Sequence, residues 1–431
     1  MQRTGLLQYY GQAPRIIETE WRKTTMTEDL FSFPVRIGDI LLRNPFIVAS
    51  GPTVKRVDQL EQAEREGWAA ASIKQTFNPS PYLNYEPRYR WLKKEKLHVF
   101  TAEYRLSMEQ GLRLVEEGRK KCRDLVIIAN YSSVGPDLES WLDAARRFES
   151  AGAQMLELNF CCPNMSFNVD ISAGEEREGR PSSGASMGQD EKSVRLVVEK
   201  TREVTSLPII AKITPEGGRI AEVSEAAYEA GADAVCSVAN RLGIPPIDVW
   251  NYRKPIYNLQ GENTMACLSG PWIKPLALRD VFEIRKRVGP SRSIIGTGGI
   301  SSWEDAVQMI LCGADGIGIC TETMLSGFGF LRKWIKSLKD YAQKMGFEKV
   351  EDFRDLLIQE IKPASDLTIW AGYAQVDTKA CSSCGLCVEI GHCNAIIMTE
   401  EAAQIDPALC QGCSTCIDLC PKGAIRMVEK K

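Results

Sequence analysis

The sequence predicts an α/β protein, a (β/α)8 TIM barrel followed by a small α+β domain rich in cysteine. Two observations support this prediction. Short apolar runs recur over most of the chain with amphipathic helical stretches between them, and eight of the 15 cysteines stand in two phased sets near its end. A chain of 431 residues is long enough for one large barrel and one small second domain. We expect an N-terminal extension (1–40), the barrel (41–330), a helical linker (331–373) and the cysteine-rich domain (374–431).

Eight apolar runs predict the strands of the barrel. They are near-continuous in Val, Ile, Leu and Ala, as strands covered on both faces must be. We assign them to Phe46–Ser50, Ala70–Lys74, Leu125–Asn130, Met155–Phe160, Pro208–Ile213, Ala234–Ala239, Ser293–Thr297 and Gly316–Cys320. The segment Glu191–Val204 shows the helical type between them, with one stripe at Val194, Val197, Val198, Thr201 and Val204. On this pattern alone, a doubly wound open sheet is the alternative.

Composition and charge argue against several classes of protein. The formal net charge is −3 and no basic, aromatic patch is evident, which disfavours nucleic acid as a partner. No apolar run approaches the ~18 residues of a membrane span, and Met1–Arg15 lacks the apolar core of an export signal. We therefore expect a cytoplasmic protein whose cysteines are metal ligands and thiols instead of disulfides.

The two cysteine sets predict two 4Fe–4S clusters. Each set has the spacing C-x-x-C-x-x-C with a more remote fourth cysteine, and in such motifs three thiolates come from one loop and the fourth from the partner motif. The crossed assignment gives one cluster to Cys381, Cys384, Cys387 and Cys420, and the other to Cys410, Cys413, Cys416 and Cys393. Zinc is the alternative, because paired C-x-x-C sequences also form zinc sites, but zinc needs neither the third cysteine nor the trailing Cys420-Pro421. Five residues separate Cys387 from Cys393 where three are usual, which changes only the local loop.

Polar residues collect where the predicted strands end, and in a barrel this is the end that carries the chemistry. They are Ser50, Lys74, Asn130, Asn159, Lys212, Asn240, Gly298, Gly299 and Thr321. The glycines of Gly296–Ile300 and Gly316–Thr321 follow the last two strands, where barrels often bind a phosphate through backbone N–H groups. Glycine also serves any tight turn, but the two loops together predict a phosphate-bearing cofactor across the barrel mouth.

The segment Glu157–Asn164 resembles the strand-4 signature of the dihydroorotate and dihydropyrimidine dehydrogenases. Further matching segments follow in order, at Asn44–Phe46, Ile73–Thr76, Ala211–Pro215, Leu268–Gly270, the double-glycine loop and Gly188–Asp190, the last resembling the end of a catalytic loop. The resemblance extends from about Asn44 through a ferredoxin-like domain at the C-terminus. A barrel joined to a two-cluster domain is similar to the dihydropyrimidine dehydrogenase branch, and most to its bacterial pyrimidine-site subunit without the flavin–nicotinamide half.

This resemblance implies that FMN binds at the barrel mouth. The implied cofactor-binding residues are Ala49, Ser50, Lys74, Asn130, Asn159, Lys212, Asn240, Gly270, Gly298, Gly299, Cys320 and Thr321. Lys212 would lie near the N1/O2 edge of the flavin, where a cation stabilises charge on the reduced ring, and Lys74 is a second candidate for this role. An ordinary surface lysine or ion pair is the alternative for each.

The resemblance also implies that Cys162 faces the substrate opposite the flavin as the catalytic proton donor. When hydride passes to one ring carbon, the neighbouring carbon needs a proton, and a thiol with a pKa of about 8.5 is largely protonated at neutral pH. The alternative for an isolated cysteine is a small buried hydrophobe, which is the role expected for Cys161. Neither of the two histidines, His98 and His392, lies in a matched motif, so we expect no histidine acid.

The expected substrate-binding residues include two departures from the family pattern. They are Asn159, Asn164, Asn240 and Arg241, with Asn164 where pyrimidine-reducing relatives tend to have His and Arg241 where a small hydroxyl residue is usual. Arg241 and the aromatic, basic segment 242–265 would suit an anionic or larger ring, unless that segment is a packed surface loop. The long stretch 163–189 predicts either a lid or a solvated excursion.

These features predict an oxidoreductase that interconverts a small cyclic substrate and its dihydro form. The preferred substrate is a pyrimidine such as uracil or thymine; the alternatives are a dihydroorotate-type or other cyclic enone or enamide reductase, and a non-catalytic electron-transfer subunit of a larger complex. No full G-x-G-x-x-G motif is present, so electrons should leave through the clusters to an external carrier, a ferredoxin or a flavin–nicotinamide subunit. A homo- or hetero-oligomer is expected.

Overall fold

The computed structural model describes residues 31–78, 84–133, 138–162, 184–238, 240–388 and 393–429. The chain divides into two compact units between Glu360 and Ile361. Each unit has a hydrophobic core of its own. The division falls inside the segment 331–373 that the sequence suggested as a linker.

The first unit is a closed barrel of eight parallel strands. They are β3 (Phe46–Val48), β4 (Ala70–Ser72), β9 (Val126–Ser133), β10 (Met155–Phe160), β11 (Ile209–Ile213), β12 (Ala234–Val238), β15 (Ser293–Thr297) and β16 (Gly316–Ile319). The spatial order is β10-β11-β12-β15-β16-β3-β4-β9, and β9 pairs with β10 again. This closure confirms the predicted barrel and excludes the open sheet. Each strand overlaps one predicted apolar run, and β9 continues three residues past its predicted end at Asn130.

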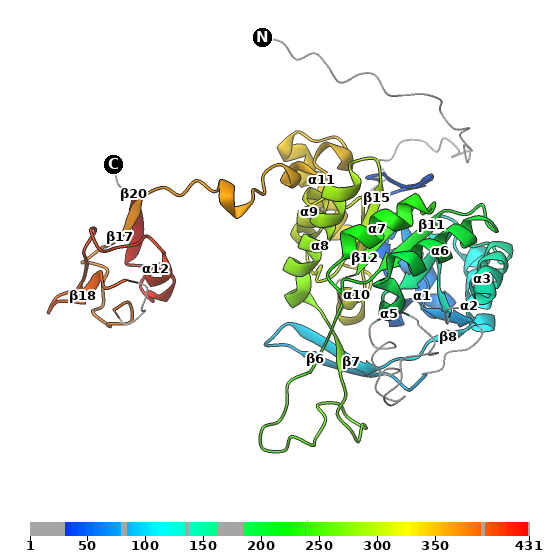
Figure 1. The fold of residues 1–431 in the computed structure, drawn as a ribbon, viewed down its shortest axis with the longest axis horizontal. Helices are drawn as coiled ribbons and strands as arrows, with labels where there is room; N and C mark the ends of the chain where they lie inside the picture. Colours follow the sequence, from blue (N-terminus) through cyan, green and yellow to red (C-terminus); the bar gives the residue numbers. More distant parts are fainter. Residues whose placement is uncertain are drawn as a thin grey trace, which may run out of the picture. The chain divides into compact units, whose positions relative to one another are not determined.

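Helices lie outside the strand ring (Figure 1). The main ones are α1 (Val57–Arg65), α2 (Met108–Lys121), α3 (Leu138–Ser150), α6 (Glu191–Arg202), α7 (Ile220–Glu229), α8 (Lys274–Val288), α9 (Trp303–Leu311) and α11 (Leu331–Met345). The predicted stripe of α6 is buried from Val194 to Thr201, while Val204 lies beyond the end of the helix. Helix α11 packs on the barrel core through Trp334, Ile335 and Leu338, so the first part of the expected linker belongs to the barrel unit.

Parallel pairing aligns the strand ends that carry polar residues. In the register of β10 with β11, Asn159 stands opposite Lys212, and in that of β10 with β9, Glu157 stands opposite Asn130. Because side chains alternate along a strand, Glu157 and Asn159 lie on the same face of β10. The register therefore gathers these side chains at one end of the barrel.

A second sheet stands at that end and was not expected from the sequence. Its strands are antiparallel in the order β13 (Arg241–Gly243), β14 (Ala266–Ser269), β7 (Leu97–Ala102) and β6 (Arg88–Leu92). The hairpin of β1 (Val35–Ile37) and β2 (Ile40–Leu42) closes the opposite end (Figure 1). We call the four-stranded sheet the mouth sheet.

The second unit is a small α+β domain, as predicted. Strand β17 (Gly372–Val376) pairs with β20 (Ile425–Glu429), β18 (Ile396–Met398) pairs with β19 (Ala403–Ile405), and the short helix α12 spans Thr415–Leu419. Two of the cysteines, Cys387 and Cys416, lie in its core.

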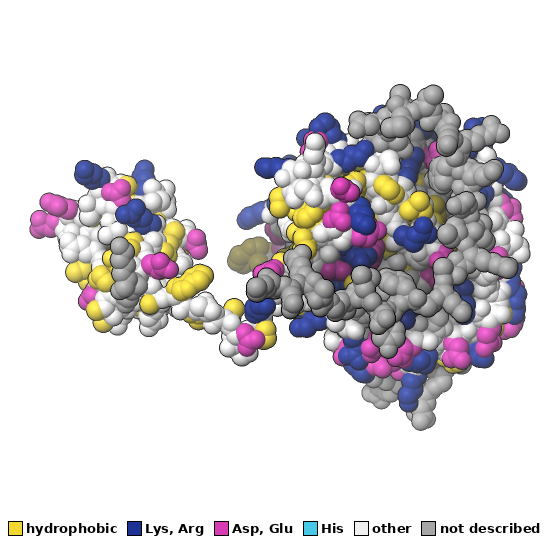
Figure 2. Space-filling view, turned by 90° about the horizontal axis from the view of Figure 1, so that it is seen from above, with side chains coloured by type: hydrophobic (Ala, Val, Ile, Leu, Met, Phe, Trp, Pro, Cys, Tyr) yellow, Lys and Arg dark blue, Asp and Glu magenta, His cyan; other side chains and the backbone are white. Residues whose placement is uncertain are grey.

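The surface of the barrel unit carries charges of both signs. On the face shown in Figure 2, lysine and arginine side chains are interspersed with aspartate and glutamate. Among the described residues, no helix is both long enough and apolar enough to cross a membrane.

Candidate active site and cluster sites

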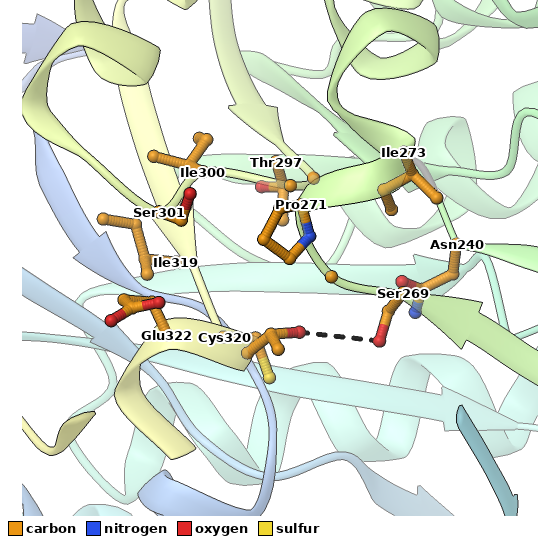
Figure 3. Close-up of a pocket in the computed structure, with 15 residues that line it drawn as sticks. Asn240, Ser269, Pro271, Ile273, Thr297, Ile300, Ser301, Ile319, Cys320 and Glu322 are labelled. Atoms are coloured by element: carbon orange, nitrogen blue, oxygen red, sulfur yellow. Dashed lines mark hydrogen bonds between the residues drawn. The ribbon is translucent and has the colours of Figure 1, made fainter. Parts of the chain in front are cut away.

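A cavity opens at the carboxyl ends of the barrel strands. Its volume is about 820 Å³ including the open mouth, and its walls come from the strand ends and from the mouth sheet. A second hollow of about 400 Å³ adjoins it beside the loops after β15 and β16 (Figure 3). The two spaces share the residues Asn240, Ser269, Thr297, Cys320 and Thr321.

The two spaces bring together 11 of the 12 residues that the sequence suggested for cofactor binding. They are Ala49, Ser50, Lys74, Asn159, Lys212, Asn240, Gly270, Gly298, Gly299, Cys320 and Thr321. The twelfth, Asn130, is fully buried beneath the cavity, where it donates to Glu157 and accepts a hydrogen bond of 3.1 Å from Asn159. Asn130 thus supports cavity residues and does not line the cavity.

Glycines in the smaller hollow stand where the backbone comes very close. Gly299 has φ of +72°, and a Cβ there would lie 2.6 Å from the backbone nitrogen of Lys274. Gly270 has φ of +99°, and its Cβ would lie 2.8 Å from the carbonyl oxygen of Lys96. Both positions require glycine, because other residues lack the space and rarely adopt this conformation. Open backbone of this kind is what a phosphate-binding loop needs.

Glu157 organises the floor of the larger cavity. Its Oε2 accepts hydrogen bonds from Ser72, from Asn130 and, at 3.3 Å, from Nζ of Lys212. Burial lowers the pKa of Lys212, but the Glu157 carboxylate, with smaller contributions from Cys236 and Cys161, raises it by more, so the net pKa is raised. Lys212 is therefore a permanently charged ammonium held by Glu157. The sequence signature contains Glu157, but only the folded barrel shows this pairing.

A second ion pair stands in the cavity wall, and its carboxylate partner was not identified from the sequence. Nζ of Lys74 lies 2.8 Å from Oε1 of Glu103, and the hydroxyl of Tyr89 donates to the other carboxylate oxygen. Burial raises the pKa of Glu103, yet Lys74, Tyr89 and Arg105 together lower it below its ordinary value. The carboxylate is therefore ionised at neutral pH. No motif marks Glu103 or Tyr89, since both reach the cavity through the mouth sheet and its flank.

His98 lines the cavity, although no matched motif contains it. The ring stacks on Tyr89 with centroids 5.4 Å apart, and Nδ1 lies 3.2 Å from the hydroxyl oxygen of Ser269. Burial lowers the pKa of His98 to about 4, against a smaller opposite effect of Glu103. The imidazole is neutral at neutral pH and does not supply a proton there. His392 lies outside the described residues.

The adjacent thiols of Cys161 and Cys162 have different surroundings. Sγ of Cys161 is buried and donates to Oδ1 of Asn159 at 3.1 Å, and burial raises the pKa of Cys161 well above its usual range. Cys162 lines the cavity, and its Sγ accepts a hydrogen bond of 3.4 Å from Nη2 of Arg105. Short helix α5 (Ala185–Gly188) supports this strand end, with the backbone N–H of Ala185 donating to the Cys162 carbonyl at 3.3 Å.

The other expected substrate residues divide into three cases. Asn159 and Asn240 line the cavity. Arg241 does not line it; its Nη2 donates to Oδ2 of Asp280 at 3.0 Å. Asn164 lies outside the described residues, as does 163–183, which holds most of the expected lid. In 242–265, Trp250 and Tyr252 are exposed, whereas Tyr257 is buried. None of the four residues Trp250, Tyr252, Arg253 and Lys254 lines the cavity.

The eight cysteines of the second unit surround two separate hollows. One, of about 340 Å³, is lined by Cys381, Cys384, Cys387 and Cys420. The other, of about 310 Å³, is lined by Cys393, Cys410, Cys413 and Cys416. These are the two crossed sets that the spacing suggested. Within the described ranges, no group of three or more His, Cys, Asp or Glu is arranged to hold a single metal ion.

The two cysteine loops share one backbone form. In each loop the residues on both sides of the second cysteine have positive φ, namely Ser383 and Gly385 in one, Gly412 and Ser414 in the other. Such turns direct consecutive backbone N–H groups to one side. The N–H of Ser383 donates to Sγ of Cys381 at 3.4 Å.

Backbone N–H groups also favour the thiolate form in both loops. Those of Ala403 and Ser383 lower the pKa of Cys381. That of Thr415 lowers the pKa of Cys413. Thiolates are the form that ligates iron.

Comparison with known proteins agrees with this architecture. The family model for dihydroorotate dehydrogenase matches residues 33–341, and that for a 4Fe–4S binding domain matches residues 403–426. The chain is 28% identical over 353 residues to the NAD-dependent dihydropyrimidine dehydrogenase subunit PreA of Escherichia coli K12, covering 80% of this chain and 81% of that protein.

Two further relatives come from different branches. The catalytic subunit of dihydroorotate dehydrogenase B (NAD(+)) from Pyrococcus furiosus is 30% identical over 327 residues, or 74% of this chain and 97% of that protein. The chloroplastic dihydropyrimidine dehydrogenase (NADP(+)) of Arabidopsis thaliana is 26% identical over 353 residues, or 77% of this chain and 78% of that protein. Identity of this size does not separate the two substrate classes.

Proposed function

The chain belongs to the dihydroorotate dehydrogenase family and is a flavin- and iron–sulfur-dependent oxidoreductase, and we propose that it interconverts an uncharged pyrimidine and its dihydro form. Uracil and thymine are the simplest such substrates. The proposal adds to the family assignment a choice of substrate, a proton donor and an electron route. It is supported by the way in which the charges around the cavity are paired.

The residues present fit the FMN that this family uses. The larger cavity offers room for a flat ring system between the strand ends and the mouth sheet, with the ammonium of Lys212 in its wall. The adjoining hollow offers the open backbone at Gly298 and Gly299 to a phosphate. When bound, FMN exchanges hydride with a substrate carbon through its N5 and single electrons with iron–sulfur centres.

The ion pairs of the cavity lysines favour an uncharged substrate. Among the described residues that line the cavity, Lys74 is paired with Glu103 and Lys212 with Glu157. Arg241, which the sequence suggested for an anionic substrate, is paired with Asp280. Each of these cations already has a carboxylate partner, so a carboxylated ring would have to compete with one. An uncharged ring requires no such exchange.

Glu103 adds a specific preference. Its carboxylate lines the same cavity as Cys162 and is ionised, since its pKa is lowered by Lys74, Tyr89 and Arg105 despite burial. A carboxylate accepts hydrogen bonds and repels another carboxylate. It therefore suits the ring N–H of a cyclic amide and disfavours orotate. The amides of Asn159 and Asn240, in the same walls, supply donors and acceptors for ring carbonyl and N–H groups.

Cys162 is the proposed proton donor. Both cysteines line the cavity, but Cys161 is buried with its thiol bonded to Asn159, whereas Cys162 is partly exposed. In the reducing direction, the S–H bond of Cys162 breaks, the proton joins the substrate carbon next to the one that receives hydride, and the sulfur keeps the electron pair. His98 is neutral in this pH range, because burial lowers its pKa to about 4.

Anaerobic mixing of the reduced protein with candidate substrates tests the proposal. Uracil and thymine should restore the absorption band of oxidised flavin at least ten times faster than orotate at equal concentration. Faster reoxidation by orotate would assign the protein to the carboxylated class, and reoxidation only by an unrelated cyclic enone would reject pyrimidines. If no small substrate reacts while an electron acceptor does, the chain is an electron-transfer subunit.

The second unit is proposed to hold two 4Fe–4S clusters on the crossed cysteine sets. Support comes from two four-thiol hollows and from two loops with the same positive-φ turns. A cube of iron and sulfide spreads its thiolates more widely than one zinc ion, whose Zn–S bonds are about 2.3 Å long. The clusters would carry single electrons between FMN and an external carrier, a ferredoxin or a flavin–nicotinamide subunit. A cytoplasmic homo- or hetero-oligomer is proposed as the working form.

A further inference from the structure

Arg105 lies directly behind the proposed proton donor and matches no motif in the sequence. Its side chain is buried, with the residue only 3% exposed. Nη2 donates to Sγ of Cys162 at 3.4 Å, Nε donates to Oε1 of Gln75 at 3.3 Å, and Nη1 donates to the carbonyl oxygen of Glu103 at 3.4 Å. A buried guanidinium is costly unless its donors are satisfied, so these contacts define its position.

The backbone around Arg105 is clamped as well. Its N–H donates to Oδ1 of Asn84 at 2.6 Å, and its carbonyl accepts from Nδ2 of the same Asn84 at 3.2 Å. Gln75 continues the network, donating to Ser132 at 3.0 Å, and Ser132 donates to the carbonyl oxygen of Asn159 at 2.7 Å. Arg105 is therefore connected by hydrogen bonds to the ends of β9 and β10. Strand β10 is the one that leads to Cys162.

We propose that Arg105 is the positioning residue for proton donation, holding the Cys162 sulfur toward the cavity and stabilising the thiolate left when the proton departs. The part of this proposal that makes Cys162 a proton donor rests on the proposed function. A cation beside a sulfur favours the thiolate, and a hydrogen bond to a charged acceptor is stronger than one to a neutral acceptor. The hydrogen bond from Arg105 therefore strengthens as the proton leaves Cys162. A contact that strengthens in this way favours proton donation by the thiol. The thiolate regains a proton from water before the next turnover.

Other titratable groups face the same cavity and contribute to the electrostatic surroundings of the Cys162 sulfur. The titratable ones in its walls are Lys74, Tyr89, His98, Glu103, Cys161, Lys212, Cys267 and Cys320. Both lysines are engaged by carboxylates, Lys74 by Glu103 and Lys212 by Glu157. Among the described residues, Arg105 is the cation whose hydrogen bond reaches the Cys162 sulfur.

The test measures the thiol directly, without a substrate. Anaerobic protein with its cofactors is treated with iodoacetamide across a pH range, and alkylation of the Cys162 peptide is quantified by mass spectrometry. Arg105→Met should move the midpoint of the rate–pH curve upward by about one pH unit, the shift expected for loss of a neighbouring charge. Arg105→Lys, which keeps the charge, should move it by less than half as much. The control is Arg202→Gln, a half-buried arginine at the amino ends of the strands, bonded to Asp233.

Each outcome has a separate meaning. An unchanged midpoint in Arg105→Met, with normal flavin content, overturns the proposal even when turnover falls, because the arginine is then merely structural. If Arg105→Met loses its flavin, the comparison of Arg105→Lys with the parent decides, since a charge effect predicts a small shift and lower kcat at unchanged KM. A shifted midpoint in a protein that reduces no pyrimidine supports the role of Arg105 and rejects only the proposed substrate.

Discussion

Lys212 and Glu157 form a buried ion pair on neighbouring barrel strands, with Nζ and Oε2 3.3 Å apart and side chains 6% and 4% exposed. The same carboxylate oxygen also holds Ser72 and Asn130, so one acceptor joins β4, β9, β10 and β11. A charge left alone at such a place is strongly destabilising. The pair is thus a structural requirement as well as part of the proposed flavin site.

The first prediction follows from this pair. Glu157→Gln should lower the free energy of unfolding by about 3–5 kcal/mol, because it leaves Lys212 charged and unpaired. Urea denaturation followed by tryptophan fluorescence measures the change, and the double variant Glu157→Gln with Lys212→Met should recover part of it. Glu225→Gln, which breaks the exposed pair with Arg287, should cost no more than about 1 kcal/mol. Equal effects of Glu157→Gln and Glu225→Gln would contradict the prediction.

The second prediction separates the two adjacent thiols. Cys162→Ser should keep flavin and clusters but slow turnover by about 10²–10⁴-fold, since serine is a much weaker acid and general acids typically contribute this much. Cys161→Ser should change turnover far less, because Cys161 is buried and its thiol is bonded to Asn159, whereas Cys162 is partly exposed. Steady-state kinetics with matched flavin content measures both. If the two variants showed the opposite phenotypes, Cys161 and not Cys162 would be the proton donor.

The third prediction concerns His98 and the stability of the fold at acid pH. Burial lowers the pKa of His98 to about 4 in the folded chain, from 6.5 for an unperturbed histidine. The unfolded chain therefore binds the proton first, so stability present above pH 6.5 is lost as the pH falls toward 4. Between pH 7 and pH 5 the contribution of His98 to the free energy of unfolding should fall by about 2 kcal/mol.

The pH dependence of His98→Gln provides the comparison for this prediction. Urea unfolding of parent and variant at pH 7 and pH 5 gives the difference between their pH dependences. The variant should lose less stability over this interval than the parent. Identical losses would show that His98 is protonated in the folded protein or accessible to water.

The fourth prediction concerns metal content. Two crossed clusters should give about eight iron atoms and eight sulfides per chain after anaerobic purification. Cys420→Ser should damage the cluster held by Cys381, Cys384 and Cys387, and Cys393→Ser the one held by Cys410, Cys413 and Cys416. Electron paramagnetic resonance of the reduced protein distinguishes the two. Cys312→Ser, at the buried end of α9 in the barrel, is the control and should leave iron unchanged. Stoichiometric zinc in place of iron would overturn the assignment.

The sequence predicted the eight strands because each is a continuous apolar run, which is a local signal. It also predicted which cysteines share a hollow, because the spacing of such motifs is constrained by the cluster they wrap. The mouth sheet was missed for the opposite reason. Its strands are short and partly polar, and it joins residues far apart in the sequence, such as His98 and Ser269, which are separated by 171 positions.

The same distinction applies to the site residues. Lys74, Asn159, Lys212 and Cys162 lie at or just after strand ends within recognisable motifs, and all four line the cavity. No motif in the sequence indicates which residues pair with these side chains and affect their charge. Glu103 and Arg105 lie on the chain after β7, and only the folded geometry brings them to Lys74 and Cys162. Arg241 shows the converse, because its place beside Asn240 in sequence suggested a substrate contact and Asp280 holds it instead.

The fifth prediction is that the isolated protein does not turn over with NADH or NADPH but does so with a one-electron dye or a protein carrier. The chain contains no full G-x-G-x-x-G motif, while its second unit offers thiol-lined hollows for clusters that would carry single electrons. Stopped-flow mixing of NADH with the oxidised protein should leave the flavin band unchanged, and reduced methyl viologen should bleach it. The cluster variants Cys393→Ser and Cys420→Ser should slow dye-driven turnover while the half-reaction of reduced flavin with substrate continues. Steady oxidation of NADH matched to substrate consumption, and unaffected by loss of the clusters, would show direct hydride transfer to FMN and leave the second unit a structural or regulatory part.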